Sequence, residues 1–330
     1  MDKQIDFLAI GDIVAEPFIK ITDAEANCDL QGEHCKICFR FGEKIPYESA
    51  EVCYAVGNSS NVAVGVSKLG LSSTLVSYVG DDYVGKQNIE SLMKDGVNID
   101  YIKIVPGMES NYHFVLWYQR ERTILVKHTE FPYSLSQDMP EAKWVYLSSL
   151  AANSIDYHTE ILEYINKYPD TKLAFQPGTF QLKMGVEALK NIYERTDILF
   201  CNLIEAKRIL DTEDSDVIKL MTDLRKLGPK IVVMTDGLDG AYADDGTDVL
   251  FVPVYSTASV ESTGAGDSFA SAMVAALILG KDLKEAMLWG PINSMSVVSY
   301  VGAQKGLLSR EKLEEILNNA PEEYKVSKIN

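Results

Sequence analysis

The chain has 330 residues, of which 46 % are hydrophobic, and it carries a formal net charge of −17 at pH 7. The length suits one α/β domain with an appendage as well as two domains, while the negative charge argues against nucleic acid or an anionic membrane as a partner. No apolar stretch reaches the ~18 residues of a membrane span, and the start MDKQIDFLAIGD has no signal-peptide core, so we expect a cytoplasmic protein.

The first predicted element is a buried strand over residues 5–11, IDFLAIG. A short apolar run that ends in glycine is typical of a strand in a parallel sheet. Asp12 follows this strand, and open α/β sheets bind ligands at the carboxyl ends of their strands. Asp12 is therefore a candidate to accept hydrogen bonds from the hydroxyl groups of a ligand, and a turn or capping role is the alternative.

Two blocks interrupt the strand–helix pattern, at residues 13–55 and 108–128. Apolar β-forming residues occur there among turn signals. In the second block, two β-rich halves surround the charged residues 119–122, which predicts a hairpin. We expect short strands that form a small sheet outside the main one.

The five cysteines are an odd number in a long chain, which argues against a disulfide framework. Cys28, Cys35, Cys38 and Cys53 lie in the first block, and Cys35-x-x-Cys38 has the spacing of a zinc site. Reduced cysteines, some of them packed as small hydrophobic residues, are the simpler expectation. The sequence leaves metal binding by these four residues open.

Strand and helix signals alternate along most of the chain. Gly57 suits a tight turn before a helix at 59–69, which carries Asn61 in its first turn, and further strand–helix units follow at 76–98 and 141–210. This succession predicts a doubly wound, mostly parallel α/β sheet.

Residues 263–267 read Thr-Gly-Ala-Gly-Asp and precede a stretch with helical periodicity that starts at Ser268. The two glycines allow a positive φ or the close approach of a ligand, and the free amides at a helix start bind anions. A carboxylate beside an anion site is explained if Asp267 takes the proton of a hydroxyl that attacks a phosphoryl group. The alternative is an ordinary aspartate that caps the helix.

These motifs, in this order, resemble those of the ribokinase-like (PfkB) carbohydrate kinases over residues 5–310. STGAGDSFASA resembles their C-terminal signature D-T-x-G-A-G-D-x-F, with Glu261 at the first acidic position. Asn202-x-x-Glu205 matches their N-x-x-E motif, and Asn61-Val-Ala matches part of their N-terminal signature. Gln176 departs from the commoner residues at its position. A Walker A sequence is absent from the chain, which excludes a P-loop kinase.

The resemblance implies a role for each motif in the ATP-dependent phosphorylation of a sugar. Asp267 would be the catalytic base, and the backbone of Gly264, Ala265 and Gly266 would hold the charge of the transferring phosphoryl group. Further implied contacts are those of Asp12, Gly57 and Asn61 with the acceptor, of Asn202 and Glu205 with Mg²⁺ through water, and of Asn202, Glu205, Thr235, Gly237, Thr263 and Asn293 with the nucleotide. The family has a β-sheet lid over the acceptor, which would exclude competing water. Some members form dimers through this lid, and some bind a monovalent cation.

The sequence thus predicts one ribokinase-like domain over residues 1–330, with a lid, that uses ATP and Mg²⁺ to phosphorylate a hydroxymethyl group of a sugar or sugar derivative. Two further acceptor classes stay open besides an unphosphorylated sugar. A nucleoside could stack on Tyr112, Phe114, Trp117 and Tyr118, and a phosphorylated sugar could bind Arg120, Arg122 and Lys127. A non-catalytic sensor that binds a sugar or nucleotide is the alternative of a different class.

Overall fold

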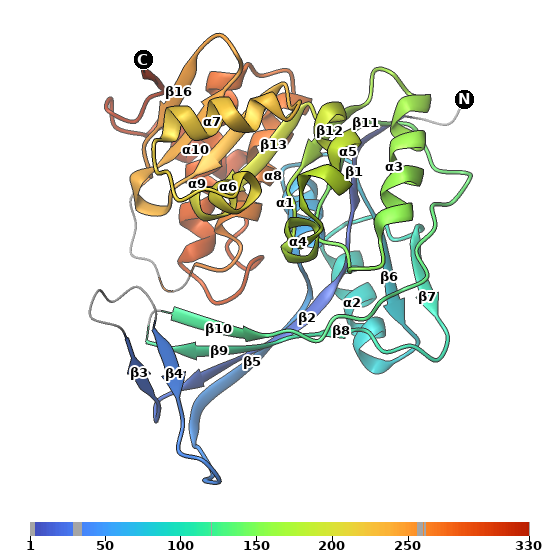
Figure 1. Ribbon diagram of the computed structural model, residues 1–330, viewed down its shortest axis with the longest axis vertical. Coiled ribbons are helices and arrows are strands. Elements are labelled where there is room, and N and C mark those ends of the chain that lie inside the picture. The colour runs from blue at the N-terminus through green and yellow to red at the C-terminus, as the bar shows by residue number, and fades with distance from the viewer. Residues whose placement is uncertain (1–3, 29–34, 120, 256–259, 261, 330) are drawn as a thin grey trace.

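A long, mostly parallel sheet forms the body of the protein, which the computed structural model describes for residues 4–28, 35–119, 121–255, 260 and 262–329 (Figure 1). Its strand order is β17-β16-β15-β14-β13-β12-β11-β1-β6-β7. The strands from β14 to β7 in this order run parallel, and β15, β16 and β17 are antiparallel to their neighbours. The strands are β1 (Ile5–Ile10), β6 (Ser73–Gly80), β7 (Ile102–Val105), β11 (Ala142–Leu147), β12 (Lys172–Phe175), β13 (Ile198–Asn202), β14 (Ile231–Thr235), β15 (Ala241–Asp244), β16 (Val249–Val252) and β17 (Ser327–Ile329).

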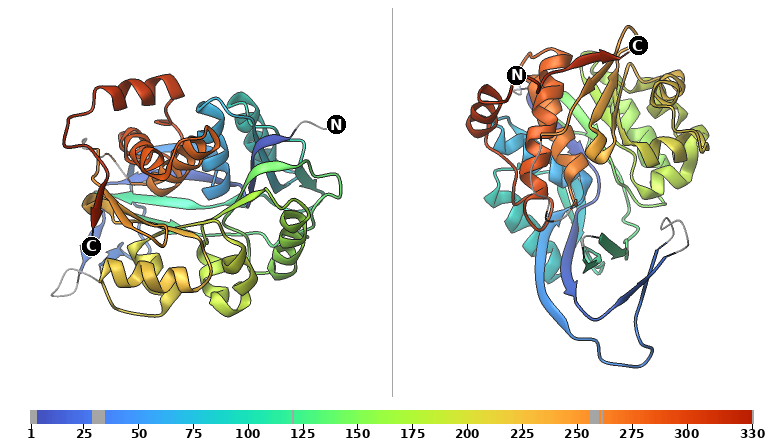
Figure 2. Two further views of the ribbon diagram at one scale, coloured as in Figure 1. Left: turned by 90° about the horizontal axis from the view of Figure 1, so that it is seen from above. Right: turned by 90° about the vertical axis from the view of Figure 1, so that its left-hand side faces the viewer.

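Helices cover both faces of this sheet (Figure 2), which confirms the predicted doubly wound architecture. One face carries α1 (Asn58–Lys68), α2 (Tyr83–Lys94), α8 (Ala265–Ile278), α9 (Leu283–Val298) and α10 (Arg310–Asn318). The other carries α3 (Ile155–Lys167), α4 (Thr179–Ala188), α5 (Lys190–Arg195), α6 (Leu203–Leu210) and α7 (Val217–Lys226). None of the described helices combines the length and the apolar character that crossing a bilayer requires.

The alternation of side chains along each strand supplies a core for both helical layers. On β1, Phe7 and Ala9 belong to the core beneath α1 and α8, whereas Leu8 and Ile10 belong to the core beneath α3. All four side chains are fully buried. The continuous apolar run of this strand is therefore explained by burial on two faces.

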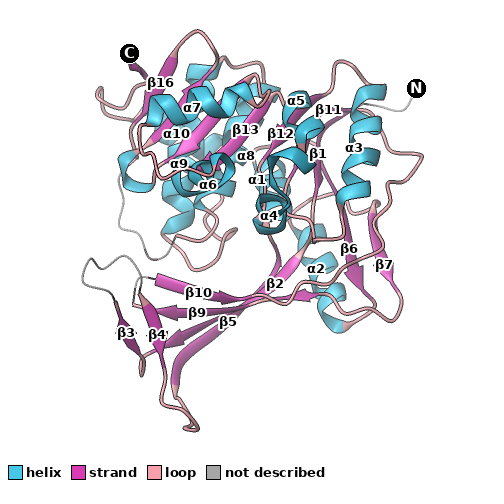
Figure 3. Ribbon diagram, viewed as in Figure 1, coloured by secondary structure: helices cyan, strands magenta, loops and turns pink. Residues whose placement is uncertain are grey.

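The two blocks that interrupt the strand–helix pattern form a second sheet, which extends from the body and which we call the lid (Figure 3). Its order is β10-β9-β2-β5, with β8 beside β2. β2 runs antiparallel to β5 and parallel to β9, so the lid is a mixed sheet. The lid strands are β2 (Val14–Ile21), β5 (Tyr47–Val56), β8 (Asn111–Tyr112), β9 (Phe114–Tyr118) and β10 (Glu121–Leu125).

The predicted hairpin is formed by β9 and β10, which pair antiparallel from Glu121 and Tyr118 onward. Glu121 and Arg122 belong to β10 and not to the turn, where Gln119 has a φ of 56°. Arg120 lies outside the described residues. The turn is therefore tighter than the charged cluster suggested.

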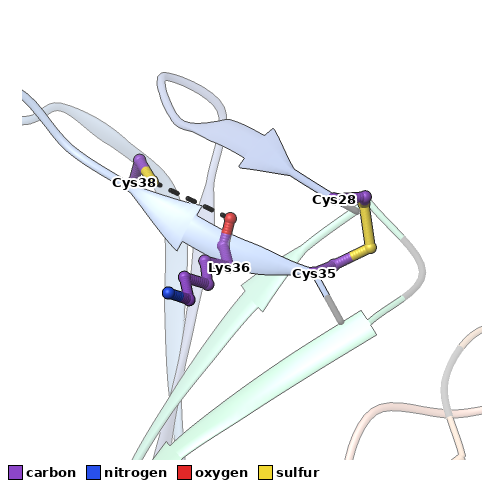
Figure 4. Close-up of a disulfide and its surroundings, with 4 residues drawn as sticks. All are labelled: Cys28, Cys35, Lys36 and Cys38. Atoms are coloured by element: carbon purple, nitrogen blue, oxygen red, sulfur yellow. Dashed lines mark hydrogen bonds between the residues drawn. A yellow bond between two sulfur atoms is a disulfide. The ribbon is translucent and has the colours of Figure 1, made fainter. Parts of the chain in front are cut away.

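The expectation of reduced cysteines is wrong for two of them, because Cys28 and Cys35 form a disulfide (Figure 4). The strands β3 (Glu25–Asn27) and β4 (Lys36–Cys38) pair antiparallel, with Asn27 opposite Lys36. This register places the next residues on each side, Cys28 and Cys35, opposite one another. Cys38 is exposed, and the described residues contain no group of three side chains suited to a metal ion.

Candidate active site

The parallel strands bring polar residues from distant parts of the chain to one edge of the main sheet. Asp12 follows β1, Gln176 follows β12, and Asn202 and Thr235 end β13 and β14 as register partners. Carboxyl ends of parallel strands lie at the same edge, which is where open α/β sheets bind ligands. The lid begins here as well, because β2 starts at Val14.

The start of α8 is a turn suited to an anion. The helix begins at Ala265 and not at the predicted Ser268, because Gly264 adopts a left-handed conformation (φ 78°) and serves as its N-cap. The first intrahelical bond runs from Ser268 N to the Gly264 oxygen at 2.8 Å, and Ala265 N bonds the Ser262 oxygen at 3.4 Å. The amides of Gly266 and Asp267 precede the first intrahelical donor and suit an anion. Gly266 is exposed, and a Cβ placed on it would meet nothing within 4 Å, so there is open space in front of the turn.

Asp267 lies in the first turn of α8, where its side chain is buried against three amides. Its Oδ1 accepts hydrogen bonds from Asn58 Nδ2 (2.9 Å) and Gln176 Nε2 (3.1 Å), and its Oδ2 accepts one from Asn61 Nδ2 (2.7 Å). Burial raises the pKa of Asp267, the three amide donors partly offset this rise, and the charge of Glu16 adds to it. A carboxylate with a raised pKa in fixed geometry suits a general base.

Two further bonds orient the amides around Asp267. Gln304 Nε2 donates to Asn61 Oδ1 at 3.0 Å, and the Tyr146 hydroxyl donates to Gln176 Oε1. With its oxygen occupied, each amide directs its nitrogen to the carboxylate. Asn61 was predicted to contact the acceptor, and the structure places its amide nitrogen on Asp267. The sequence did not identify Asn58, Gln176 or Gln304 as site residues. Its one signal was that Gln176 differs from the residues that are commoner at this position in the family.

Asp12 is buried on the acceptor side of this edge, with one oxygen bonded and one not. Its Oδ2 lies 2.7 Å from His128 Nε2 and accepts a hydrogen bond of 2.6 Å from the Tyr133 hydroxyl, whereas its Oδ1 is buried with no partner. Gly57, which precedes α1, has a φ of 108°. A Cβ on it would lie 2.8 Å from the backbone oxygen of Asp12, so only glycine allows α1 to start this close to Asp12. Sequence reasoning missed His128 and Tyr133, since no local pattern marks them.

Asn202 and Glu205 form a capping box at the start of α6. Asn202 Oδ1 accepts from Glu205 N at 2.8 Å, and Glu205 Oε2 accepts from Asn202 N at 2.9 Å. Burial raises the pKa of Glu205, and the charge of Asp267 contributes to the rise. The Glu205 carboxylate and the exposed Asn202 amide are oxygen donors on one helix turn, which fits a hard divalent cation held mainly through water.

The remaining predicted nucleotide contacts lie in different settings. Thr235 is half-buried at the edge, Gly237 begins an exposed 3₁₀ turn (Gly237–Asp239), and Thr263 directly precedes Gly264. Asn293 is fully buried on α9. Its amide donates to the Ser268 oxygen at 2.9 Å, and its Oδ1 accepts from Leu308 N at 3.1 Å, so it braces the start of α8. Glu261, the altered residue of the signature, lies outside the described residues.

The raised pKa of Asp267 predicts how activity depends on pH. A base accepts a proton only when ionised, so kcat/KM should fall as the pH drops through a pKa above the usual aspartate range. Glu16→Gln removes one of the charges that raise this pKa and should move the fall in kcat/KM to lower pH.

The measurement is a pH profile of kcat/KM, in which each sample is also returned to pH 7 and assayed again to exclude unfolding. Glu48→Gln, an exposed lid carboxylate paired with Lys20, should leave the profile in place. If the pH profile of Glu16→Gln matches that of the wild type, the pH dependence does not report the ionisation of Asp267.

Comparison with known proteins identifies the family of this chain. The model of the pfkB family carbohydrate kinases matches residues 23–310. The ATP-dependent 6-phosphofructokinase of Thermoanaerobacterium thermosaccharolyticum is 26 % identical over 315 residues, which cover 92 % of this chain and 90 % of that protein. The nucleoside kinase of Methanothermobacter thermautotrophicus is 27 % identical over 262 residues, which cover 76 % of this chain and 80 % of that protein.

The fold agrees with this result. The solved structure of Arabidopsis thaliana ribokinase, complexed with ribose and ATP, superposes with a TM-score of 0.78 at 20 % sequence identity and covers 96 % of this chain and 99 % of its own. The chain therefore belongs to the PfkB family of carbohydrate kinases and is a sugar or nucleoside kinase of that family.

Proposed function

We propose that this protein transfers the γ-phosphoryl group of ATP to a hydroxymethyl group of a sugar or sugar derivative. The observation that carries the proposal is the position of Asp267. It is a buried carboxylate in the first turn of α8, next to a glycine turn that faces open space and across the edge from Asp12. A base, an anion site and an acceptor-side carboxylate are the parts that this reaction requires.

The proposed step assigns a task to each group. Asp267 takes the proton of the acceptor hydroxyl, whose oxygen attacks the γ-phosphorus. The bond from that phosphorus to the bridging oxygen breaks, and ADP leaves with the electron pair. The amides at the start of α8 hold the negative charge of the transferring group in place. Asn58, Asn61 and Gln176 keep the carboxylate aimed at the hydroxyl, so most of the rate comes from positioning and electrostatics.

Kinases of this family use ATP together with Mg²⁺. We propose that Asn202 and Glu205 hold the ion through water, where it would neutralise charge on the phosphates. The nucleotide would lie along the edge that Thr235, Gly237 and Thr263 line. Binding of a monovalent cation, dimerisation through the lid and a cytoplasmic location stay predictions from the sequence.

Glu205→Gln should raise the Mg²⁺ concentration needed for half-maximal activity by about tenfold, because outer-shell partners of a metal typically contribute this much. Glutamine still completes a capping box, so the helix should keep its stability. The measurement is an Mg²⁺ titration at fixed ATP. Glu285→Gln is the matched control, since Glu285 forms the same capping box with Asp282 at the start of α9. An equal shift in both variants would contradict the Mg²⁺ role.

A nucleoside acceptor is the second candidate, and the aromatic residues of the lid favour it. Tyr112 and Phe114 lie edge to face with ring centroids 5.2 Å apart, and Phe114 is 43 % exposed. A half-buried tyrosine beside an exposed phenylalanine could stack on a base. Tyr112→Ala would then raise the KM of a nucleoside and leave that of a sugar unchanged.

The test of the proposed function is an assay of ATP consumption with Mg²⁺ across pentoses, hexoses, keto-deoxy acids, phosphorylated sugars and nucleosides. We expect one strong acceptor class in the wild type and no turnover with it in Asp267→Asn. If ATP binds but no acceptor is phosphorylated, the chain is a sensor or acts outside these classes, and the proposal fails.

A further inference from the structure

A second polar cluster lies where the lid joins the body, and the proposed phosphoryl transfer does not use all of it. Glu16 on β2 lies 3.5 Å from His113 Nδ1, the rings of His113 and His128 are 5.7 Å apart, and His128 contacts Asp12. These four residues, Glu16, His113, His128 and Asp12, are called the lid-base cluster below. Their side chains are between 1 and 12 % exposed. Such burial is unusual for two carboxylates and two imidazoles unless they have partners.

Two polar atoms of the lid-base cluster are buried without a hydrogen-bond partner, Asp12 Oδ1 and His113 Nε2. Unpartnered buried groups of this kind are uncommon in folded proteins, because each loses its bonds to water and gains none in return. The side chain of Asp12 is only 1 % exposed, so bulk solvent does not satisfy it. A ligand that supplies hydrogen-bonding groups would complete both atoms.

The lid-base cluster adjoins the turn of α1 that holds Asp267. The backbone oxygen of Asp12 lies beside Gly57, which precedes α1, and the first turn of α1 carries Asn58 and Asn61, whose amides bond Asp267. From the other side, the ring of Phe180 on α4 lies 5.2 Å from His128. The cluster therefore lies next to the residues that hold Asp267, between the start of α1 and α4.

The charges of the lid-base cluster discriminate between acceptors. In the described part of the chain, Asp12 and Glu16 each lie within 4.0 Å of a histidine nitrogen, and neither forms a salt bridge with a lysine or an arginine. Lys183 lies over the Phe180 ring but is exposed to solvent, and Arg122 of the lid bonds Ser262 at 2.5 Å. A phosphate or carboxylate at this end of the acceptor would face two carboxylates, and like charges in a buried site are strongly unfavourable.

The hydrogen-bonding chemistry of Asp12 leads to the same conclusion. A carboxylate oxygen only accepts hydrogen bonds, so the partner of Asp12 Oδ1 must be a donor. An ionised phosphate or carboxylate cannot donate, whereas a hydroxyl both donates and accepts. A hydroxyl also suits His113 Nε2, which accepts when Nδ1 carries the proton toward Glu16 and donates when the ring is charged.

We infer that the lid-base cluster selects an uncharged, polyhydroxylated acceptor over its phosphorylated or carboxylated form, with His113 Nε2 binding a hydroxyl in addition to the one already expected at Asp12. Glu16 acts as a positioning residue that orients His113. This inference rests on the proposed kinase function and narrows its acceptor class. It separates the chain from the phosphofructokinase that it resembles, whose name implies a phosphorylated acceptor.

The first test uses the wild-type protein and the acceptor found in the ATP-consumption assay. Its kcat/KM is compared with those of the phosphate ester and the aldonic acid of the same sugar, and with deoxy analogues that each lack one hydroxyl. We expect kcat/KM for the neutral sugar to exceed that for the charged forms by at least about a hundredfold. Removal of the hydroxyl at one or two positions should lower kcat/KM by a similar factor, because a site that hydrogen-bonds a hydroxyl discriminates against an analogue that lacks it. A preference for the phosphate or the acid overturns the inference and leaves the kinase function intact. Failure of every acceptor overturns both.

The second test uses Glu16→Gln and His113→Gln, with Glu48→Gln as the control on the same lid. Both variants should raise the KM of the neutral acceptor about tenfold while the KM of ATP stays unchanged. They should also reduce the ratio of kcat/KM between the sugar and the deoxy analogue that lacks the bound hydroxyl, which a merely structural defect would not do. If that ratio keeps its wild-type value in a folded variant, the assignment of Glu16 and His113 is wrong.

Discussion

Asp267→Asn should lower kcat by about 10²–10⁴-fold, the usual range for the loss of a general base, while ATP binds with nearly unchanged affinity. Asparagine keeps the shape of the side chain but cannot take the proton of the acceptor hydroxyl. The surrounding amides cannot replace it, because Asn58, Asn61 and Gln176 all present donors to this position. The measurement combines single-turnover phosphoryl transfer with calorimetric titration of ATP.

Asp156→Asn is the matched control for this prediction. Asp156 also lies in the first turn of a helix, α3, but its side chain is exposed to solvent. Its variant should have wild-type turnover. If Asp267→Asn keeps its turnover within a few-fold of the wild type, Asp267 is a capping residue and the mechanism proposed above is incorrect. Thermal unfolding of both variants shows whether a loss of activity is a loss of fold.

Gly264→Ala should lower the stability of the protein, whereas Gly266→Ala should lower its activity. Alanine at Gly264 would need a positive φ, and its Cβ would lie 2.4 Å from Ala303 Cβ, so we expect destabilisation by about 2 kcal/mol or more. Alanine at Gly266 meets nothing within 4 Å and should leave stability unchanged. Its methyl group would enter the space in front of the turn, where a shifted phosphoryl group should lower kcat by about a hundredfold.

Chemical denaturation and steady-state kinetics separate these two outcomes. Gly280→Ala is the control for the backbone alone, because Gly280 has a similar φ of 83° with open space around it. It should lose less stability than Gly264→Ala, and the difference measures the clash with Ala303. Full activity in Gly266→Ala would show that the open space is not the phosphate site.

The features that the sequence marked depend on neighbouring residues. Asn202 and Glu205 are three positions apart, which is the spacing at which a helix start lets each side chain reach the other's backbone, and the structure has this capping box. Asp267 follows two glycines at a helix start, so its place beside an anion turn is local as well. The apolar run of β1 likewise marked a strand buried on both faces.

The surroundings of those residues could not be predicted, because they come from distant parts of the chain. Asn58 and Asp267 are 209 positions apart, and Asp12 and His128 are 116 positions apart. A lone histidine in the loop after β10 has no periodicity or motif that distinguishes it from a surface residue. The disulfide was missed for a related reason, since only the register of β3 and β4 places Cys28 opposite Cys35.

The sequence by itself thus determined the alternation of strands and helices, the position of the glycine turn and which carboxylate we propose as the base, since these depend on hydrophobic period and local backbone chemistry. The tertiary structure alone decided how Asp267 is held and which side chains surround Asp12. Parallel strands bring their carboxyl ends to one edge whatever their separation in the chain, and the lid adds Glu16 and His113 from two further segments. The specificity that we propose for the site depends on those long-range contacts.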